Sequence, residues 1–215
     1  MARQVAHEIK NPLTPMKLSI QYLQKAINNN QPNVKELSSS VANTLVEQID
    51  HLSKIAADFS QFANIGNTNV TTFDLHEVLG SLKELYTSDD NVLFDWRPVN
   101  DRVLVDADKT QMNRLFTNLF ANAVEACQGN GICRIEVHEI RNENTIRVSI
   151  KDNGEGIALE MQERIFIPNF TTKSSGTGLG LAMCKGIVEQ ARGKIWFETE
   201  QGRGTTFHVE LPVVS

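Results

Sequence analysis

The stretch that decides the fold runs from Asn153 to Leu181. It opens with Asn153–Ile157 (NGEGI) and closes with Gly176–Leu181 (GTGLGL), and a polar segment separates these two glycine clusters. Glycine lets the backbone turn at positive φ and lets another molecule approach closely. A helix that begins directly after such a loop offers free N–H groups and a positive dipole end, which suit a phosphate group. The spacing matches neither the dinucleotide fingerprint nor the Walker loop, and alone it is weak evidence. The signal becomes strong through Asp152 directly before it, Asn118 and Asn122 upstream, and His7.

The composition is that of a soluble globular protein. The 215 residues are 40% hydrophobic and 22% charged, which is enough for one large or two small cores. The net charge of -5 gives no basic footprint, so we expect no nucleic-acid partner. No apolar run approaches the roughly 20 residues of a membrane span, and no signal peptide is visible. We expect a cytoplasmic fragment, with any membrane contact made through a missing upstream region.

The cysteine pattern predicts no cross-link. Cys127, Cys133 and Cys184 lack C-x-x-C spacing and are odd in number. Scattered cysteines of this kind are typical of buried, reduced thiols, and we expect all three to be reduced.

Residues 1–65 predict two amphipathic helices joined by a turn at residues 28–33. Apolar residues recur at three- and four-residue steps on both sides of that turn. An antiparallel hairpin leaves much of each apolar stripe in water, and two copies paired as a four-helix bundle would bury it. We therefore predict an all-α dimerisation domain and a homodimer, followed by a polar linker at residues 66–72.

Residues 73–215 predict a second domain, an α+β sandwich. Asp74 and Glu77 resemble a capping box at the start of a helix. Further helical patterns cover 108–127 and 178–192, and strand patterns cover 91–96, 102–105, 133–137, 145–150, 195–199 and 205–211. Runs of this order predict a mostly antiparallel sheet with helices on one face.

His7 has an unusual helical context. Asn11 lies one turn after it on the same face, and Pro12 and Pro15 remove helical hydrogen bonds directly afterwards. A neutral, exposed imidazole is a competent nucleophile, and Glu8 could orient the ring or accept its proton. The alternative is an ordinary surface histidine, although two prolines in a periodic helix argue against it.

Five motifs in this order resemble the boxes of bacterial sensor histidine kinases, most closely their nitrogen-regulation class. They are His7–Leu13 for the H-box, Asn118–Ala123 for the N-box, Asp152–Ile157 and Gly176–Leu181 for the two glycine boxes, and Ile165–Lys173 for the F-box. The resemblance covers essentially the whole chain, including Gly202–Phe207 near its end. It implies a dimeric helical phosphotransfer domain followed by an ATP-binding domain of the GHKL, or Bergerat, type.

The resemblance implies roles for individual residues. Asp152 would accept a hydrogen bond from the adenine amino group of ATP, and the amide oxygens of Asn118 and Asn122 would help to hold Mg²⁺. Lys173 would neutralise γ-phosphate charge. The other residues of the implied nucleotide site are Gly154, Gly156, Gly176, Thr177, Gly178, Leu179, Gly180 and Thr205.

Each of these side chains also has a plainer interpretation. Asp152 alone could be a turn aspartate, the two asparagines could be helix-surface residues, and Lys173 could be a solvated loop lysine. Phe166 and Phe170 could anchor the lid or simply pack in the core. The F-box departs from the family pattern at Ile167 and Asn169.

Asn118 favours a kinase over an ATPase. Related ATPases carry a glutamate at this position that activates water, whereas asparagine cannot act as a general base near pH 7. The implied activity is autophosphorylation of His7, phosphotransfer to a response regulator aspartate, and a phosphatase activity in which Asn11 holds the attacking water. Two alternatives stay open: a nucleotide-sensing dimeric scaffold and a stand-alone ATPase. The full-length protein of such a family can be anchored in the inner membrane.

Overall fold

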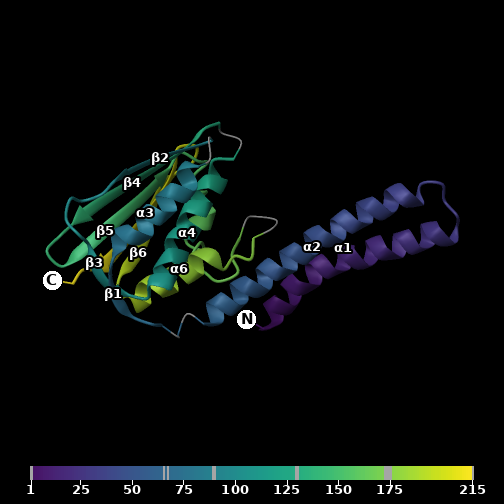
Figure 1. Cartoon of the computed structure of the whole chain (residues 1–215), viewed down its shortest axis with the longest axis horizontal. Helices are drawn as coiled ribbons and strands as arrows, with labels where there is room; N and C mark the ends of the chain where they lie inside the picture. Colours follow the sequence, from purple (N-terminus) through teal and green to yellow (C-terminus); the bar gives the residue numbers. More distant parts are fainter. Residues whose placement is uncertain are drawn as a thin grey trace. The chain divides into compact units, whose positions relative to one another are not determined.

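The structure of the chain is a computed structural model that contains both predicted parts (Figure 1). It describes residues 2–64, 66, 68–88, 91–128, 131–171 and 176–214, with side chains from Glu8 onward. The backbone divides into two units, the first comprising Met1–Ala63 with Thr171–Leu179 and the second comprising Asn64–Phe170 with Gly180–Ser215.

The N-terminal sequence forms the predicted helical hairpin. Helix α1 runs over Ala2–Asn28 and helix α2 over Val34–Ala63. The turn between them uses Asn30 at a φ of 48°, a conformation that asparagine tolerates better than most residues. Both prolines of the H-box lie inside α1, so the helix continues through them. Within the described ranges, no helix combines the length and apolar character that a membrane crossing requires.

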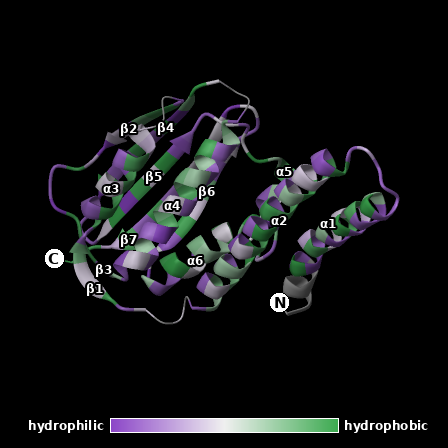
Figure 2. Ribbon diagram, turned by 45° about the vertical axis from the view of Figure 1, so that its right-hand side comes forward, coloured by the Kyte–Doolittle hydropathy of each residue, from purple (hydrophilic) through white to green (hydrophobic). Residues whose placement is uncertain are grey.

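The hairpin leaves many apolar side chains in solvent. Its buried apolar side chains include Ala26, Val41 and Ile55. Figure 2 shows hydrophobic and hydrophilic residues interleaved along both helices. The large apolar side chains that are exposed on this single chain include Ile9, Leu13, Leu18, Ile20, Tyr22, Ile27, Val46 and Ile49.

The second unit is built on a five-stranded mixed sheet in the order β2-β4-β5-β7-β6. The strands are β2 (Val92–Arg97), β4 (Cys133–Arg141), β5 (Thr145–Asp152), β7 (Gly204–Pro212) and β6 (Lys194–Glu200). Only the β2–β4 pair is parallel among these described strands. The prediction of a mostly antiparallel sheet is confirmed.

Three helices cover one face of this sheet (Figure 1). They are α3 (Leu75–Thr87), α4 (Lys109–Ala126) and α6 (Gly180–Gln190). Strand β4 alternates between a buried set that faces the helices and a set on the opposite face, because successive side chains of a strand point to opposite sides. Phe116 and Phe120 of α4 are fully buried in the layer between helices and sheet.

Short elements and one cap differ from the prediction. Strand β1 (Thr71–Asp74) pairs with β3 (Leu104–Ala107) and takes the last two residues of the predicted linker. Helix α5 (Leu159–Gln162) was not predicted. Asp74 does cap α3, but its carboxylate accepts from the His76 N–H, while Glu77 pairs with Lys109 rather than closing a capping box.

The prediction of three reduced thiols was wrong for two of the cysteines. Cys127 and Cys133 form a disulfide, with their Cα atoms 5.3 Å apart. Cys127 caps the end of helix α4 and Cys133 begins strand β4, so the disulfide joins the ends of these two elements. Cys184 is free and fully buried, and this burial raises the pKa of its thiol to about 12.

Candidate functional site

Asp152 is the centre of the predicted nucleotide site in the second unit. It ends strand β5 and is only 3% exposed. Its Oδ1 atom accepts hydrogen bonds from the backbone N–H of Gly154 at 2.9 Å and of Thr205 at 3.1 Å. These two bonds fix the first glycine box and the start of β7 around one carboxylate. No described residue bonds the second oxygen, so that oxygen can accept from a ligand.

The environment of Asp152 also sets its protonation. Burial raises the pKa of the Asp152 carboxyl, because the charged form loses contact with water, and the two backbone N–H donors oppose this only in part. A partly desolvated carboxylate selects strongly for a hydrogen-bond donor, since leaving it unpaired is costly. The site therefore suits an amino group such as that of adenine.

Two glycines allow close backbone approaches at the first glycine box and at the start of β7. Gly204 has a φ of 108°, and a Cβ atom there would collide with the carbonyl oxygen of Asp152. Gly156 has a φ of 72°, and its Cβ would collide with the carbonyl oxygen of Glu200. Side chains are excluded at both positions by space as well as by backbone conformation.

Asn118 and Asn122 lie one turn apart on α4 and are both half-buried. Gly180, the first residue of α6, lies against Asn118: a Cβ atom at Gly180 would be 3.6 Å from Asn118 Oδ1. The predicted N-box and the start of the predicted phosphate-binding helix are thus neighbours. Amide oxygens at a helix N-terminus can share a metal ion with bound phosphates.

Comparison with known proteins agrees with this geometry. Residues 107–215 match the family model described as "Histidine kinase-, DNA gyrase B-, and HSP90-like ATPase". The chain belongs to this ATPase family. Residues 1–68 match a second model, "His Kinase A (phospho-acceptor) domain", so the chain has the two-part organisation of histidine kinases.

Individual relatives point the same way. Sensor histidine kinase ZraS of Klebsiella oxytoca is 32% identical over 99% of this chain, and nitrogen regulation protein NtrY of Azorhizobium caulinodans is 31% identical over 98%. The chain spans 46% of the first relative and 28% of the second. A crystal structure of histidine kinase ThkA in complex with response regulator protein TrrA aligns with the whole chain and 61% of the matched one, at a TM-score of 0.75 and 28% identity.

The predicted lid is the glycine-rich loop before Gly180 that would close over the triphosphate. Its described residues from Gly176 to Leu179 lie in the first unit of this histidine kinase-like ATPase chain. Gly176, Gly178 and Leu179 precede α6, and Gly178 adopts a φ of 65°. The buried hydroxyl of Thr177 donates to the carboxylate of Asp58 on α2 at 2.6 Å, a partner that no sequence signal indicated. The predicted γ-phosphate ligand Lys173 lies outside the described residues.

The phosphoacceptor motif lies on α1. His7 is part of this helix, although its side chain lies outside the described residues. Glu8 is half-buried, Asn11 is exposed, and Pro12 is buried. The predicted helical placement of the H-box is confirmed, and the roles of its side chains stay predictions.

Sequence reasoning missed the side chains that support the glycine boxes. Thr199 Oγ1 accepts from the backbone N–H of Ile157 at 2.9 Å and contacts Thr205 Oγ1 at 3.0 Å. The Oδ1 atom of Asn153 accepts from the backbone N–H of Arg134 at 2.7 Å, which ties the glycine box to β4. Threonine in a strand and asparagine in a turn are common, so neither carries a signal in one sequence.

The two phenylalanines of the F-box are placed differently. Phe166 packs against Phe197 and Phe207 of the β6–β7 hairpin, with ring centroids 6.0 and 6.5 Å apart. Phe170 lies under the guanidinium of Arg164 at 4.4 Å. Phe166 is thus a packing residue of the second unit, which was the plainer of its two interpretations.

Proposed function

We propose that this chain is the catalytic core of a sensor histidine kinase. It binds ATP at Asp152, transfers the γ-phosphoryl group to His7, and passes that group to an aspartate of a response regulator. One observation carries the proposal: the chain that matches a phospho-acceptor domain around His7 also matches an ATPase domain with a buried, half-satisfied carboxylate at Asp152.

The transfer is a displacement at phosphorus. A neutral ring nitrogen of His7 attacks the γ-phosphorus, the bond to the β–γ bridging oxygen breaks, and ADP leaves. The ring proton must then be lost, and Glu8 is the neighbouring base that could take it. Asn118 supplies no base for water, so the phosphoryl group is directed to the imidazole rather than to hydrolysis.

The α4 asparagines suit Mg²⁺ better than any other described group. Both offer neutral oxygen ligands, and Asn118 lies beside the N-terminus of α6, which is where a triphosphate would bind. Among the described residues, no cluster of three or more His, Cys, Asp or Glu side chains could hold a metal ion. A metal at Asn118 and Asn122 would therefore depend on the nucleotide, and when bound it would neutralise phosphate charge.

The decisive experiment is labelling of the full chain with ATP carrying radioactive γ-phosphate. We expect a protein label that is labile in acid and stable in alkali. The label should disappear in His7→Gln and persist in His51→Gln, a matched substitution on α2 of the same hairpin. An unchanged label in His7→Gln would contradict the assignment of the phosphoacceptor.

The same experiment separates the two alternatives. Phosphate release without labelled protein would favour a stand-alone ATPase. Nucleotide binding without either reaction would favour a dimeric scaffold. The motif residues argue for the kinase, because Asn118 lacks the water-activating carboxylate and His7 retains the nucleophile.

We further propose that Asn11 orients a water molecule for dephosphorylation of the regulator. It is exposed one turn after His7, where an amide can hydrogen-bond a water without adding charge. Asn11→Ala should lose phosphatase activity towards a phosphorylated receiver domain and keep autophosphorylation. Equal loss of both activities would remove the assignment.

A response regulator receiver domain is the proposed partner of the hairpin. The support is the ThkA structure, a complex with response regulator protein TrrA. Transfer of label from the phosphorylated chain to candidate receiver domains tests the partner, and regulators whose acceptor aspartate is replaced by alanine provide the control.

A further inference from the structure

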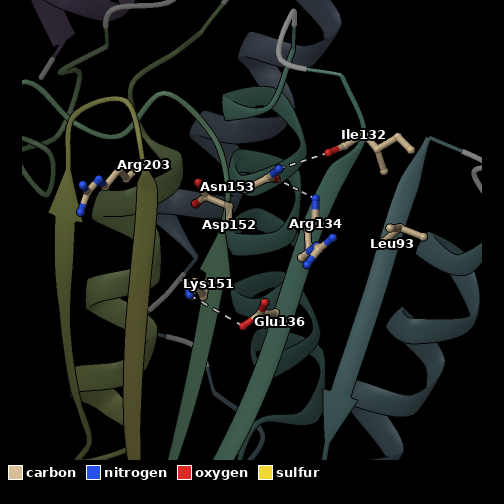
Figure 3. A pocket seen from close by; sticks show the side chains of 8 residues that line it. All are labelled: Leu93, Ile132, Arg134, Glu136, Lys151, Asp152, Asn153 and Arg203. Carbon is tan, nitrogen blue, oxygen red and sulfur yellow. Dashed lines mark hydrogen bonds and ion pairs between the residues drawn. The ribbon is translucent and has the colours of Figure 1, made fainter.

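A pocket of about 350 Å³ opens on the second unit and shares only Asp152 with the predicted nucleotide residues. Figure 3 shows it from close by, with the helices behind the sheet. Its lining consists of Leu93, Ile132, Arg134, Glu136, Lys151, Asp152, Asn153 and Arg203. Three of these side chains are cationic and two are large and apolar, so the pocket offers both positive charge and apolar surface.

Strand alternation places this pocket on the open face of the sheet. Cys133 and Ile135 of β4 are buried on the face that the helices cover. Arg134 and Glu136 alternate with them along the strand and therefore lie on the opposite, open face. On β5, Lys151 is exposed while Asp152 is buried. Asn118 and Gly180, which lie in the helix layer, are absent from the lining. The pocket is therefore distinct from the predicted nucleotide site and meets it only at Asp152.

The apolar end of the pocket lies at β2. Leu93 is 49% exposed and Ile132 is 58% exposed, although both are large aliphatic residues. Figure 3 shows both on the β2 side, with Arg134 next to them and Lys151 and Arg203 further along the sheet. Covering exposed aliphatic surface is favourable by about 25 cal/mol per Å², so an apolar body would bind at this end.

The polar end is available to an anion chiefly through Arg134. Lys151 is paired with Glu136 at 3.8 Å, and Arg203 is paired with Glu200 at 3.1 Å. The guanidinium of Arg134 has no carboxylate partner within the described part of the chain. A guanidinium binds a carboxylate through two parallel hydrogen bonds, which gives both orientation and strength.

Both carboxylates in the lining already have ionic or hydrogen-bonding partners. Glu136 is engaged by Lys151, and Oδ1 of Asp152 is engaged by two backbone N–H groups. Asn153 is hydrogen-bonded to two other residues of the lining. Its Oδ1 atom accepts from the backbone N–H of Arg134 at 2.7 Å, and its Nδ2 atom donates to the backbone carbonyl oxygen of Ile132 at 3.2 Å. Both Arg134 and Ile132 line the pocket, so an occupant changes the surroundings of the Asn153 amide.

We propose that this open-face pocket binds a small organic carboxylate with an apolar or aromatic body. The carboxylate pairs with Arg134, and the body lies on Leu93 and Ile132. The site goes beyond nucleotide binding and does not depend on the kinase activity of the chain.

The test is a titration of the full, ¹⁵N-labelled chain with 2-naphthoate, followed by backbone amide shifts. We expect saturable shifts at Arg134, Lys151 and Asn153, with a dissociation constant of about 1 mM or tighter. Shifts confined to the α4 and Gly180 amides, or shifts that never saturate, would overturn the proposal.

Variants and analogues define the two ends of the pocket. Arg134→Glu should weaken binding about tenfold or more, as expected for loss of a charge-assisted pair. Arg97→Glu, an exposed arginine on the same face of β2 but outside the pocket, should leave binding unchanged. Ile132→Asn provides a second, apolar-end variant that should also weaken binding, and thermal unfolding of each variant checks its fold.

The ligand itself is tested by two analogues. The neutral 2-naphthalenemethanol and the small anion acetate should both bind more weakly than 2-naphthoate. Equal binding of the alcohol would overturn the role of Arg134, and equal binding of acetate would overturn the role of Leu93 and Ile132. Retained affinity in Arg134→Glu would overturn the site as a whole.

Discussion

Asp152, the last residue of β5, joins three properties: burial, two backbone donors on one oxygen, and a second oxygen without a described partner. A plain turn aspartate would need only the Gly154 N–H. The bond from Thr205, 53 residues later in the chain, means that the fold gathers two separate segments around this carboxylate. That arrangement fits a carboxylate that recognises a ligand.

The protonation of Asp152 gives the first prediction. Because burial raises the pKa of its carboxyl, the folded protein takes up this proton at a higher pH than an ordinary aspartate with a pKa of 3.8. The ionised carboxylate is the stronger acceptor for an adenine amino group, so ATP affinity should fall on acidification through that raised pKa. Fluorescence anisotropy with a labelled ATP analogue measures this, and Asp101→Asn, at an exposed loop position, is the control.

The raised pKa of Asp152 also makes the free energy of unfolding depend on pH, in the direction opposite to that of ATP affinity. Between the unfolded and the folded pKa values the native state binds more protons, so this group lowers the free energy of unfolding as the pH rises through that window.

Asp152→Asn should remove the acid loss of ATP affinity together with most of the affinity itself. Full affinity in Asp152→Asn at neutral pH would contradict the role of the carboxylate.

Gly204 and Gly202 form a matched pair for the second prediction. Both adopt positive φ, at 108° and 81°, but a Cβ atom at Gly204 would collide with the Asp152 carbonyl while one at Gly202 meets nothing within 4 Å. Gly202→Ala should lower the free energy of unfolding by about 1 kcal/mol through backbone strain. Gly204→Ala should lower it by roughly 2 kcal/mol more, because its surroundings must also shift. Chemical denaturation checks both values, and equal losses would contradict the close approach.

At the scale of elements, helix α4 connects the core to the nucleotide site. Its N-terminus is capped by Asp108, and its apolar face buries Phe116 and Phe120. The face that carries Asn118 and Asn122 is only half-buried. A rigid core face therefore holds the predicted metal-binding face in place.

The packing of Phe120 gives the third prediction. Its ring meets Phe94 edge-on at 5.2 Å and Tyr86 edge-on at 5.6 Å, and it is fully buried. Phe120→Ala should lower the free energy of unfolding by about 3–5 kcal/mol, as for other buried aromatic residues. Leu85→Ala, at a 61% exposed position on α3, should change it by less than about 1 kcal/mol. Denaturant titrations that follow unfolding of the second unit measure both changes in the free energy of unfolding.

The sequence predicted the long, periodic elements well and the short ones poorly. Both hairpin helices, α4 and strands β4 to β7 repeat their apolar residues often enough to reveal a period. Strand β1 and helix α5 have four residues each, which is too few for any period to emerge. The Cys127–Cys133 pairing was missed for another reason, since it depends on how the end of α4 and the start of β4 are placed in the fold.

In the candidate site, too, the motifs were predicted from the sequence, whereas single supporting contacts were not. Asp152, Asn118 and Gly180 were predicted because their motifs stand in family order. The structure places Asn118 against Gly180, and Asp152 against Gly154 and Thr205, and their roles stay predictions. Thr199 and Asn153 support the glycine boxes through single hydrogen bonds to distant backbone groups. Contacts of that kind depend on register between strands, which one sequence does not contain.

At the scale of the whole molecule, the exposed apolar side chains of the hairpin need a partner surface. The second unit buries a sizeable core of its own, whereas α1 and α2 leave Leu18 59% exposed and Val46 58% exposed. Contiguous apolar surface on a soluble helix pair is typical of an association face. A second copy of the same hairpin offers the complementary stripe and would complete a four-helix bundle.

Light scattering coupled to size-exclusion chromatography tests this last prediction, and we expect the mass of a dimer. The double variant Leu18→Asp, Val46→Asp should weaken the dimer by about a hundredfold or more, because each new carboxylate would have to be desolvated in an apolar interface. Leu159→Asp provides the matched control, since Leu159 is 78% exposed but lies on α5 in the second unit. A dimer that persists in the double variant would exclude these two positions from the interface. A monomer for the unaltered chain would leave the exposed stripe to another protein, and labelling of His7 would then have to occur within one chain.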